Sequence, residues 1–328
     1  MLPMPSFDAP QNASQTESMR RPRFKRVPPK TALTMAPTLF EVLELVYQFR
    51  ALRSHHIAMH LPHRHQRGLS HSLRLLFDHG LLDKRLCGLY ECDTYLLTKR
   101  GLALLAGRDL PPRYLFLEGG LDIKLSTEWE HGMMTIDLLS NLKIGAEAAG
   151  CRLIAAEEML ATATSATPFI FPRHAEYTDR KSRKVVPYTL VPDGFAGVEY
   201  PNGKRAYFAI EAEHNKPHSR FDDDDPASTQ SSSRKKIKQY RDVDWQQVYA
   251  NLGIGNLRVM MVAPTAKQIK GKFAVARSVV KQSHLFLGQA VPVVGTQDVP
   301  TMPEIFDAPW LRIGLPPEQI NRVTLKRR

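Results

Sequence analysis

The stretch that most constrains the fold is LVPDGFAGVEYPNGKRAYFAIEAE, residues 190–213, which predicts two neighbouring β-strands. A Pro-Asn-Gly sequence at residues 201–203 divides it, and Asn-Gly between two strand-like segments is a strong signal for a tight hairpin turn. The strands of a hairpin run antiparallel, so the start of the first and the end of the second lie at the same end of a sheet. We therefore expect Asp193, Glu211 and Glu213 to gather at one rim.

Asp193 and Glu211 are the candidate metal ligands. They are expected on adjacent strands, and convergent carboxylates are the oxygen ligands that hold Mg²⁺ or Mn²⁺ against a phosphate. If the site is catalytic, its cofactor is therefore expected to be Mg²⁺ or Mn²⁺. The alternative is a set of exposed carboxylates at strand ends that neighbouring Arg and Lys balance.

The charge of the chain favours a polyanionic partner. Lys and Arg number 45 against 33 Asp and Glu, a net charge of +12, which favours nucleic acid and, less strongly, an anionic membrane surface. No segment approaches the roughly 20 apolar residues of a membrane span, and the first residues lack the apolar core of a signal peptide. We expect a cytoplasmic protein with no membrane partner; the sequence gives no oligomeric state.

Residues 1–32 are expected to be a disordered basic arm. They are rich in Pro, Ser and Gln and end in a basic run that includes Arg23, Lys25 and Arg26. An arm of this kind engages the phosphates of double-stranded DNA by releasing counterions. The alternative is a tail that only keeps the chain in solution.

Residues 33–107 are expected to form a winged helix-turn-helix domain. Apolar residues at helical spacing predict a first helix from Leu39 to Phe49, a second over residues 54–61 and a third with Ser70 as its N-cap. Two short strands and a helix capped by Thr98 follow. In such a domain the third helix enters the major groove.

The residues expected to contact DNA lie on the outer face of that third helix and at the start of the wing. Arg74 is the best candidate for a base contact, because Arg pairs in bidentate fashion with guanine. Lys84 and Arg85 are expected to contact phosphates, and Ser70 and His71 lie beside Arg74 on the outer face. The alternative is a winged helix used only for protein contacts or dimerisation.

Residues 108–124 contain Pro-Pro and Gly-Gly pairs and are expected to be a linker to a second domain, residues 125–290. That domain opens with a helix whose apolar stripe includes Trp129, Met133 and Ile136, with Asp137 on or near the polar side. A strand over residues 151–156, the hairpin, a helix over residues 234–249 and a buried strand near residues 256–264 complete the order αβββαβ. Residues 291–328 are expected to be a Pro-rich basic tail.

This order, with an Asp after Pro192 and an acidic strand end, resembles the PD-(D/E)xK nuclease core. Together with the winged helix, a helix bearing His131, PDG at residues 192–194, EAE at residues 211–213 and Lys and Tyr at residues 238–240, it resembles the replication-relaxation family of plasmids and other mobile elements. The resemblance implies an α/β (α+β) fold, with Asp193 and Glu211 as metal ligands. It also places Glu213 where an active nuclease of this type has Lys.

That glutamate leaves two readings of the domain open, because a carboxylate cannot stabilise the negative charge that develops on a phosphate. In the first reading, Lys235, Lys236 or Lys238 of the following helix takes the place of the missing lysine, and we assign Lys238 to the site. In the second reading, the domain binds DNA without cleaving it.

The expected function is that of a DNA-binding protein of a plasmid or mobile element acting in replication, relaxation or mobilisation. The alternatives are an active Mg²⁺-dependent DNA endonuclease and a non-enzymatic adaptor that contacts replication or conjugation proteins.

Overall fold

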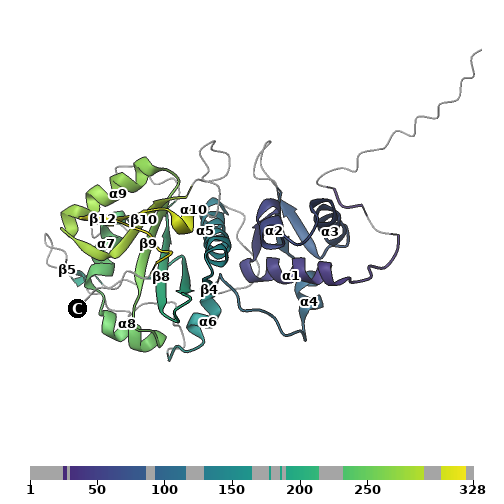
Figure 1. Cartoon of the computed structure of the whole chain (residues 1–328), viewed down its shortest axis with the longest axis horizontal. Coiled ribbons are helices and arrows are strands. Elements are labelled where there is room, and N and C mark those ends of the chain that lie inside the picture. The colour runs from purple at the N-terminus through teal and green to yellow at the C-terminus, as the bar shows by residue number, and fades with distance from the viewer. Residues whose placement is uncertain are drawn as a thin grey trace, which may run out of the picture.

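The computed structural model describes residues 25–27, 30–85, 93–115, 129–164, 177–178, 185–186, 190–213, 232–291 and 304–322. The chain folds as a mixture of helices and sheets, as expected for the α/β (α+β) class. Figure 1 shows a mainly helical N-terminal unit beside a larger unit built on a seven-stranded sheet. No helix in these ranges combines the length and the apolar character needed to cross a membrane.

The N-terminal unit combines helices with a small antiparallel sheet. In chain order its elements are α1 (Pro37–Phe49), β1 (Ala51–Arg53), α2 (Ser54–His60), α3 (Gln66–Asp78), β2 (Leu82–Arg85), β3 (Thr94–Leu97) and α4 (Lys99–Leu105). The strand order is β1-β3-β2. Strand β1 was not predicted, because a strand of three buried residues is too short to show alternation.

Helix α3 begins about one turn earlier than predicted. Its N-cap is His65, whose Nδ1 accepts a hydrogen bond of 3.2 Å from the backbone N–H of Arg67. Ser70 therefore lies exposed inside the helix, and its prediction as the N-cap was wrong. Serine is favoured at N-caps, but the unprotonated nitrogen of an imidazole can accept the same bond. The apolar residues of α3 face the core as expected: Leu73, Leu76 and Phe77.

The larger unit is organised around strands in the order β12-β11-β10-β9-β8-β7-β4. Their bounds are β4 (Arg152–Ile154), β7 (Gly194–Glu199), β8 (Arg205–Ala212), β9 (Arg258–Ala263), β10 (Ser283–Ala290), β11 (Trp310–Ile313) and β12 (Leu315–Glu318). Strands β8, β9 and β10 are parallel, and the other neighbours are antiparallel. The sheet thus continues past residue 290, where the sequence analysis ends this domain.

The predicted hairpin is β7 and β8. Its turn lies at residues 201–203, where Gly203 adopts φ 75°, a backbone conformation that favours glycine. A separate pair, β5 (Tyr177–Thr178) and β6 (Val185–Val186), forms a second small sheet.

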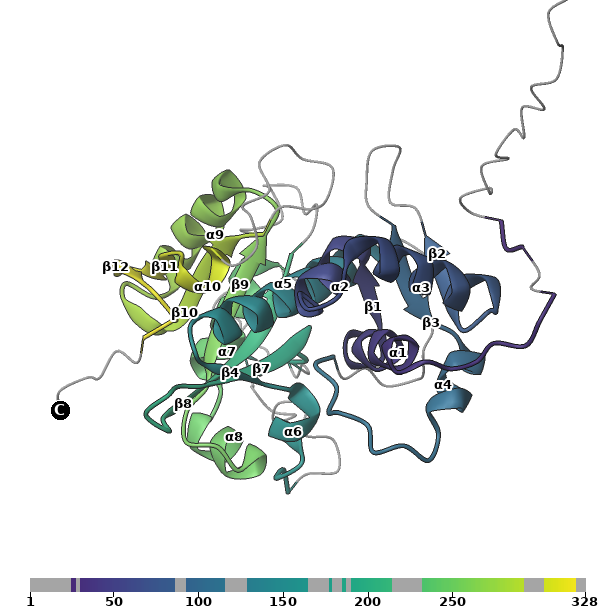
Figure 2. The same ribbon diagram turned by 45° about the vertical axis from the view of Figure 1, so that its right-hand side comes forward.

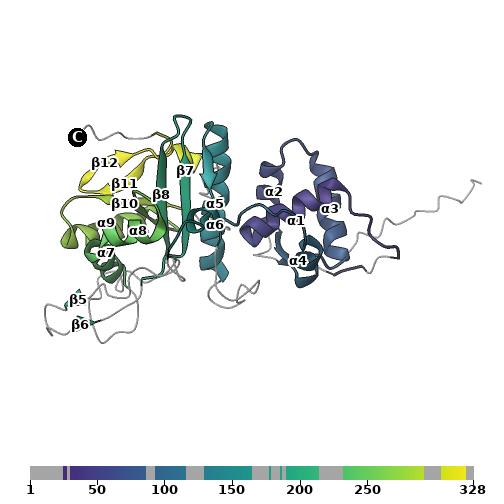
Figure 3. The same cartoon turned by 90° about the horizontal axis from the view of Figure 1, so that it is seen from below.

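Helices cover both faces of the large sheet (Figure 3). Helix α5 (Trp129–Ala148) packs on one face, and α10 (Glu304–Asp307) contacts it. The other face is covered by α6 (Ala156–Leu160), α7 (Ser233–Asp242), α8 (Trp245–Leu252) and α9 (Ala266–Val279). The side chains of β8 alternate accordingly: Phe208 and Ile210 face α5, whereas Ala209 and Glu211 face α7.

The helix predicted over residues 234–249 is two helices. The chain leaves α7 at Val243, and Asp244 starts α8 by accepting hydrogen bonds from the backbone N–H groups of Gln246 and Gln247, at 3.1 and 3.2 Å. An Asp inside an apolar-periodic segment can act as an N-cap, and here that local bond interrupts the helix.

Helix α5 lies between the sheet and the N-terminal unit, which Figures 2 and 3 show from two sides. Residues 133–142 of α5 are all buried, because β1 and α2 cover the side that faces away from the sheet. The expectation that Asp137 lies on or near a polar side was therefore wrong: the residue is only 5% exposed. A helix buried on both sides loses the one-sided apolar stripe of a surface helix.

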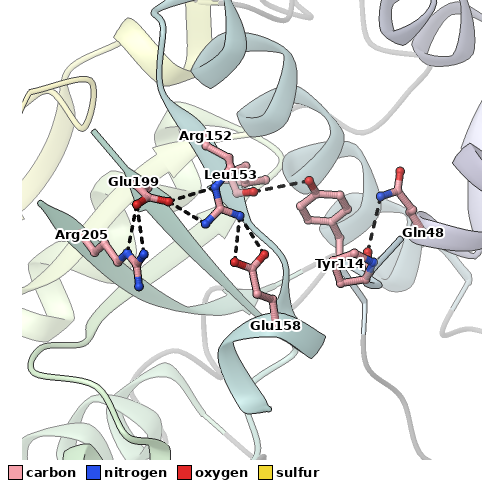
Figure 4. A network of polar contacts seen from close by, with 8 residues as sticks. Gln48, Tyr114, Arg152, Leu153, Glu158, Glu199 and Arg205 are labelled. Carbon is pink, nitrogen blue, oxygen red and sulfur yellow. Dashed lines mark hydrogen bonds and ion pairs between the residues drawn. The ribbon is translucent and has the colours of Figure 1, made fainter. Parts of the chain in front are cut away.

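A polar network joins α1 to the β4 edge of the sheet (Figure 4). The backbone N–H of Tyr114 donates to the carbonyl of Gln48 at 2.8 Å, and its hydroxyl donates to the carbonyl of Leu153 at 3.4 Å. Next to Leu153, Arg152 pairs with both Glu158 and Glu199. Tyr114, at the end of the described part of the expected linker, is therefore buried between the two units.

Candidate active site

Asp193 and Glu211 lie close together at one rim of the large sheet. The register of β7 and β8 ends with Gly194 opposite Ile210, and Asp193, one residue before β7, donates its backbone N–H to the carbonyl of Ile210 at 2.8 Å. Glu211 is the next residue of β8, and the charges of both carboxylates raise the pKa of Lys236, so both lie near that ammonium. The turn at residues 201–203 sets this register, so the local sequence of the hairpin brings the two carboxylates together.

Asp193 is held by groups from two directions. Its Oδ1 lies 2.9 Å from Nε2 of His131, in the first turn of α5, and its Oδ2 accepts a 2.8 Å hydrogen bond from the backbone N–H of Ala212. Burial raises the pKa of Asp193, but the ammonium of Lys236 and the His131 imidazole outweigh it, so the pKa lies below its ordinary value. Asp193 is therefore an anion at neutral pH.

Glu211 is fully buried and is contacted by two residues of α7. The ammonium of Lys236 forms an ion pair with Oε2, and the hydroxyl of Tyr240 donates to Oε1 at 2.5 Å. Burial raises the pKa of Glu211, and Lys236 only partly opposes this. Burial lowers the pKa of Lys236, but the negative charges of Glu211 and Asp193 have the larger effect and raise this pKa above its ordinary value. The ammonium of Lys236 therefore stays charged.

Glu213 has different neighbours from Glu211. Its Oε2 accepts a 2.8 Å hydrogen bond from the hydroxyl of Ser233, at the start of α7, and forms an ion pair with Lys272 of α9. The Lys272 ammonium also donates to the Ser233 hydroxyl at 3.2 Å. Both charged side chains are 1% exposed, and burial lowers the pKa of Lys272 to about 7, with the charge of Glu211 opposing the shift. Glu213 therefore links β8 to α7 and α9.

Lys236, rather than the assigned Lys238, is the α7 lysine that pairs with Glu211. Lys236 and Tyr240 are four residues apart and share one side of the helix, whereas Lys238 is two residues from each and projects from a different side. Sequence reasoning missed Tyr240 and Lys272 as parts of this cluster. The i, i+4 spacing of Lys236 and Tyr240 was the available signal; nothing local pointed to Lys272.

The donors at this rim fit a hard divalent cation. Two carboxylates, Asp193 and Glu211, lie at this rim, and no group of three or more His, Cys, Asp or Glu that could hold a metal occurs among the residues that the structure describes. Zinc sites use three or four protein ligands, but Mg²⁺ keeps several waters and binds through one or two carboxylates. The pair thus suits Mg²⁺ or the similar Mn²⁺, provided that Lys236 yields part of its contact with Glu211.

The residues of the N-terminal unit that are expected to contact DNA differ in exposure and in their contacts with the protein. Ser70 and His71 are exposed on α3. Arg74 lies beside them, but its guanidinium pairs with Asp78 at 2.8 Å and donates to the carbonyl of Lys25 at 3.0 Å. The arm residues described next to Lys25 also lie on α3: Arg26 donates to the carbonyl of Phe77, at 2.9 Å.

The two residues predicted at the start of a wing, Lys84 and Arg85, also contact other side chains. Lys84 pairs with Asp93 at 2.6 Å and is 8% exposed, and the guanidinium of Arg85 lies 4.6 Å from the ring centroid of Trp129. The exposed residues among those predicted and described are therefore Lys25, Arg26, Ser70 and His71, whereas Arg74, Lys84 and Arg85 are partly buried. Arg23 lies outside the described residues.

Comparison with models of protein families, with curated proteins and with solved structures finds no match for this chain.

Proposed function

We propose that the chain is a DNA-binding protein of a plasmid or mobile element, with an N-terminal winged helix and a PD-(D/E)xK-like domain that cleaves DNA. The element order α5, β4, β7, β8, α7, β9 supports the second assignment, because it follows the αβββαβ order of that nuclease core. Three helices followed by the β2 and β3 pair support the first. The net charge of +12 supports a polyanionic partner.

Cleavage is supported by one observation above the others. The ammonium of Lys236 pairs with Glu211 and lies close enough to Asp193 for its charge to act on it, so a lysine of α7 can supply the cation that Glu213 cannot. An ammonium held at this rim can stabilise negative charge that develops on a phosphate oxygen. The site therefore combines two carboxylates and one lysine, residue types that can support metal-dependent phosphodiester hydrolysis.

The protein groups have separate roles in this proposal. Asp193 and Glu211 would hold Mg²⁺ or Mn²⁺, which when bound supplies Lewis-acid polarisation of the phosphate. Tyr240 orients Glu211 by donating to Oε1, and His131 orients Asp193 from α5. Lys236 faces the scissile phosphate as the charge-stabilising group.

A second candidate is a domain that binds DNA without cleaving it. The observation in its favour is that both carboxylates already have protein partners: Lys236 and Tyr240 for Glu211, and His131 and the Ala212 N–H for Asp193. A lysine between two acids can neutralise the site in place of a metal.

Incubating supercoiled plasmid with Mg²⁺ or Mn²⁺ separates the two candidates. Cleavage by the wild type, lost in Asp193→Asn, supports the nuclease. Wild-type protein that binds the plasmid without nicking it in either metal supports the second candidate. Nicking that persists in Asp193→Asn would exclude Asp193 as a ligand and overturn the proposed site.

A further inference from the structure

A cavity of about 550 Å³ opens at the rim of the sheet opposite the acidic site. Arg258, the first residue of β9, lines it, whereas Val262 near the end of the same strand accepts a hydrogen bond from the Glu213 N–H. At about 3.3 Å per residue, the two ends of β9 are roughly 15 Å apart. The cavity is therefore separate from the carboxylates, and its volume is that of a small-molecule site, about 300–1,000 Å³.

Aromatic side chains form one wall of this cavity. Trp245 and Tyr249 are four residues apart on α8, so they lie on one side of that helix, with ring centroids 5.8 Å apart. Both are partly exposed, and Phe286 of β10 adds a third ring to the lining. Partly exposed aromatic faces beside a cavity offer a flat, apolar surface on which a planar ring can stack.

Guanidinium groups from three elements surround the same cavity. Arg258 of β9 and Arg312 of β11 share one carboxylate, Glu318, at 2.9 and 2.7 Å. Two positive charges on one negative charge leave the trio at +1. Arg241, at the end of α7, adds another guanidinium to the lining, and it pairs with Asp242, its neighbour in the sequence. An exposed pair of this kind contributes little and can exchange for an incoming anion.

We propose that this cavity binds one nucleotide, with the base stacked on Trp245 and Tyr249 and the phosphate beside Arg241. The combination of ring surfaces and an excess of guanidinium groups matches a ligand that is planar and aromatic at one end and anionic at the other. Within a duplex both faces of a base are covered by its neighbours, so only an unpaired base can stack on these rings, and the ligand is an unpaired nucleotide of single-stranded DNA or a free mononucleotide. This proposal does not rest on cleavage at the acidic site.

The test uses the full chain and two ligands. Fluorescence anisotropy measures the binding of a labelled oligothymidylate, and calorimetry measures the binding of thymidine monophosphate. Trp245→Leu is expected to lower the affinity for the bound ligand by about tenfold, because one stacking ring is lost. Trp245→Phe keeps a ring and is expected to retain most of the affinity. Binding of the oligonucleotide alone identifies a strand as the ligand, and binding of both identifies the nucleotide itself.

Arg241→Gln tests the contact with the phosphate, and Arg152→Gln is its matched control. Arg152 is an exposed guanidinium at the far β4 edge of the sheet, so its loss removes the same charge without touching the cavity. Arg241→Gln is expected to weaken binding several-fold more than Arg152→Gln. Equal losses in these two variants, unchanged binding in Trp245→Leu, binding of neither ligand, or duplex DNA that competes as well as the single strand would each overturn the proposal.

Discussion

Arg53, the last residue of β1, donates from Nε and Nη2 to the carboxylate of Asp137 in α5, and its shortest contact to each oxygen is 2.9 Å. The two side chains are 2% and 6% exposed, so this pair joins the N-terminal unit to the sheet unit inside the protein. A buried ion pair is a matched set: its desolvation cost is offset only while both partners are present.

We predict that Asp137→Ala lowers the free energy of unfolding by about 3–5 kcal/mol, because it leaves the Arg53 charge buried without its partner. The double variant Arg53→Met with Asp137→Leu is expected to recover most of that loss. Urea denaturation measures both. Glu44→Ala, which breaks an exposed pair with Arg108, is the control and is expected to cost less than about 1 kcal/mol. A loss in Asp137→Ala no larger than in this control would contradict the prediction.

A second prediction concerns pH, through the buried histidines beside this pair. Burial lowers the pKa of His56 from 6.5 to about 4 and that of His60 to about 3. Both are therefore neutral in the folded state, whereas in the unfolded chain they take up a proton below about pH 6.5. The unfolded state then binds more protons, so stability falls as the pH drops from about 6.5 towards 4.

For His56 alone this loss reaches about 3 kcal/mol, at about 1.4 kcal/mol per pKa unit. Urea denaturation at pH 7 and at pH 4.5 measures it. His56→Leu is expected to reduce the pH dependence by about this amount, and His71→Gln, which changes an exposed histidine of α3, is the matched control. An equally steep pH dependence in His56→Leu would assign the effect to other groups.

The parts of this structure that could be predicted are those that local chemistry fixes. The Asn-Gly turn sets the register of β7 and β8, and that register brings Asp193, just before β7, to the end of β8 that carries Glu211. The direction of Lys236 could not be predicted in the same way, because the side from which a helical residue projects depends on where the helix packs. Lys272 approaches Glu213 only because α9 packs on α7, a tertiary contact with no trace in the local sequence.

The end of the sheet could not be predicted for a related reason. Strand β12 contains Pro316 and Pro317, which argue against a strand, yet at the edge of a sheet the missing N–H groups can face away from the neighbour. Strand β10 lacks clear alternation, because helices and neighbouring strands enclose its middle. The sequence therefore indicates a tail where the structure has further strands.

The third prediction separates the lysines of α7. Lys236→Met is expected to reduce plasmid cleavage by about 10²-fold or more, the usual effect of removing a charge-stabilising donor from an active site. Lys238→Met is expected to retain cleavage, because Lys238 projects from a different side of α7. Lys270→Met, on the exposed side of α9, controls for the loss of a positive charge that binds DNA nonspecifically. If Lys238→Met is the inactive variant, the assignment based on the Glu211 contact is wrong.

The fourth prediction concerns Glu213 and Lys272, which hold α7 and α9 to the end of β8. Lys272→Met leaves the Glu213 carboxylate buried with the Ser233 hydroxyl but without the ammonium, and it is expected to destabilise the fold by about 3 kcal/mol. Adding Glu213→Gln removes the unpaired charge and is expected to restore much of the stability. Thermal unfolding of the single and double variants measures this, and additive losses would show that the two groups act independently.

The last prediction concerns Arg74, whose guanidinium is held by Asp78 and by the carbonyl of Lys25. The backbone N–H of Val27 also donates to Asp78, at 2.9 Å, so Asp78 fixes both the arginine and the arm beside it. Asp78→Asn removes the ion pair, releases Arg74 towards solvent and is expected to tighten DNA binding. Asp109 is an exposed acid in residues 108–115, and Asp109→Asn makes the same change of charge. It is expected to tighten DNA binding less than Asp78→Asn does.

Arg74→Ala is expected to weaken binding to a selected target by about 1–3 kcal/mol more than binding to random DNA, if the released side chain reads a base. Removing residues 1–30 is instead expected to weaken both equally and to reduce the salt dependence, as phosphate contacts do. Fluorescence anisotropy across a range of salt concentrations measures all of these. Equal losses on both DNAs for Arg74→Ala, together with no gain for Asp78→Asn over Asp109→Asn, would mean that Arg74 serves only to hold the arm on α3.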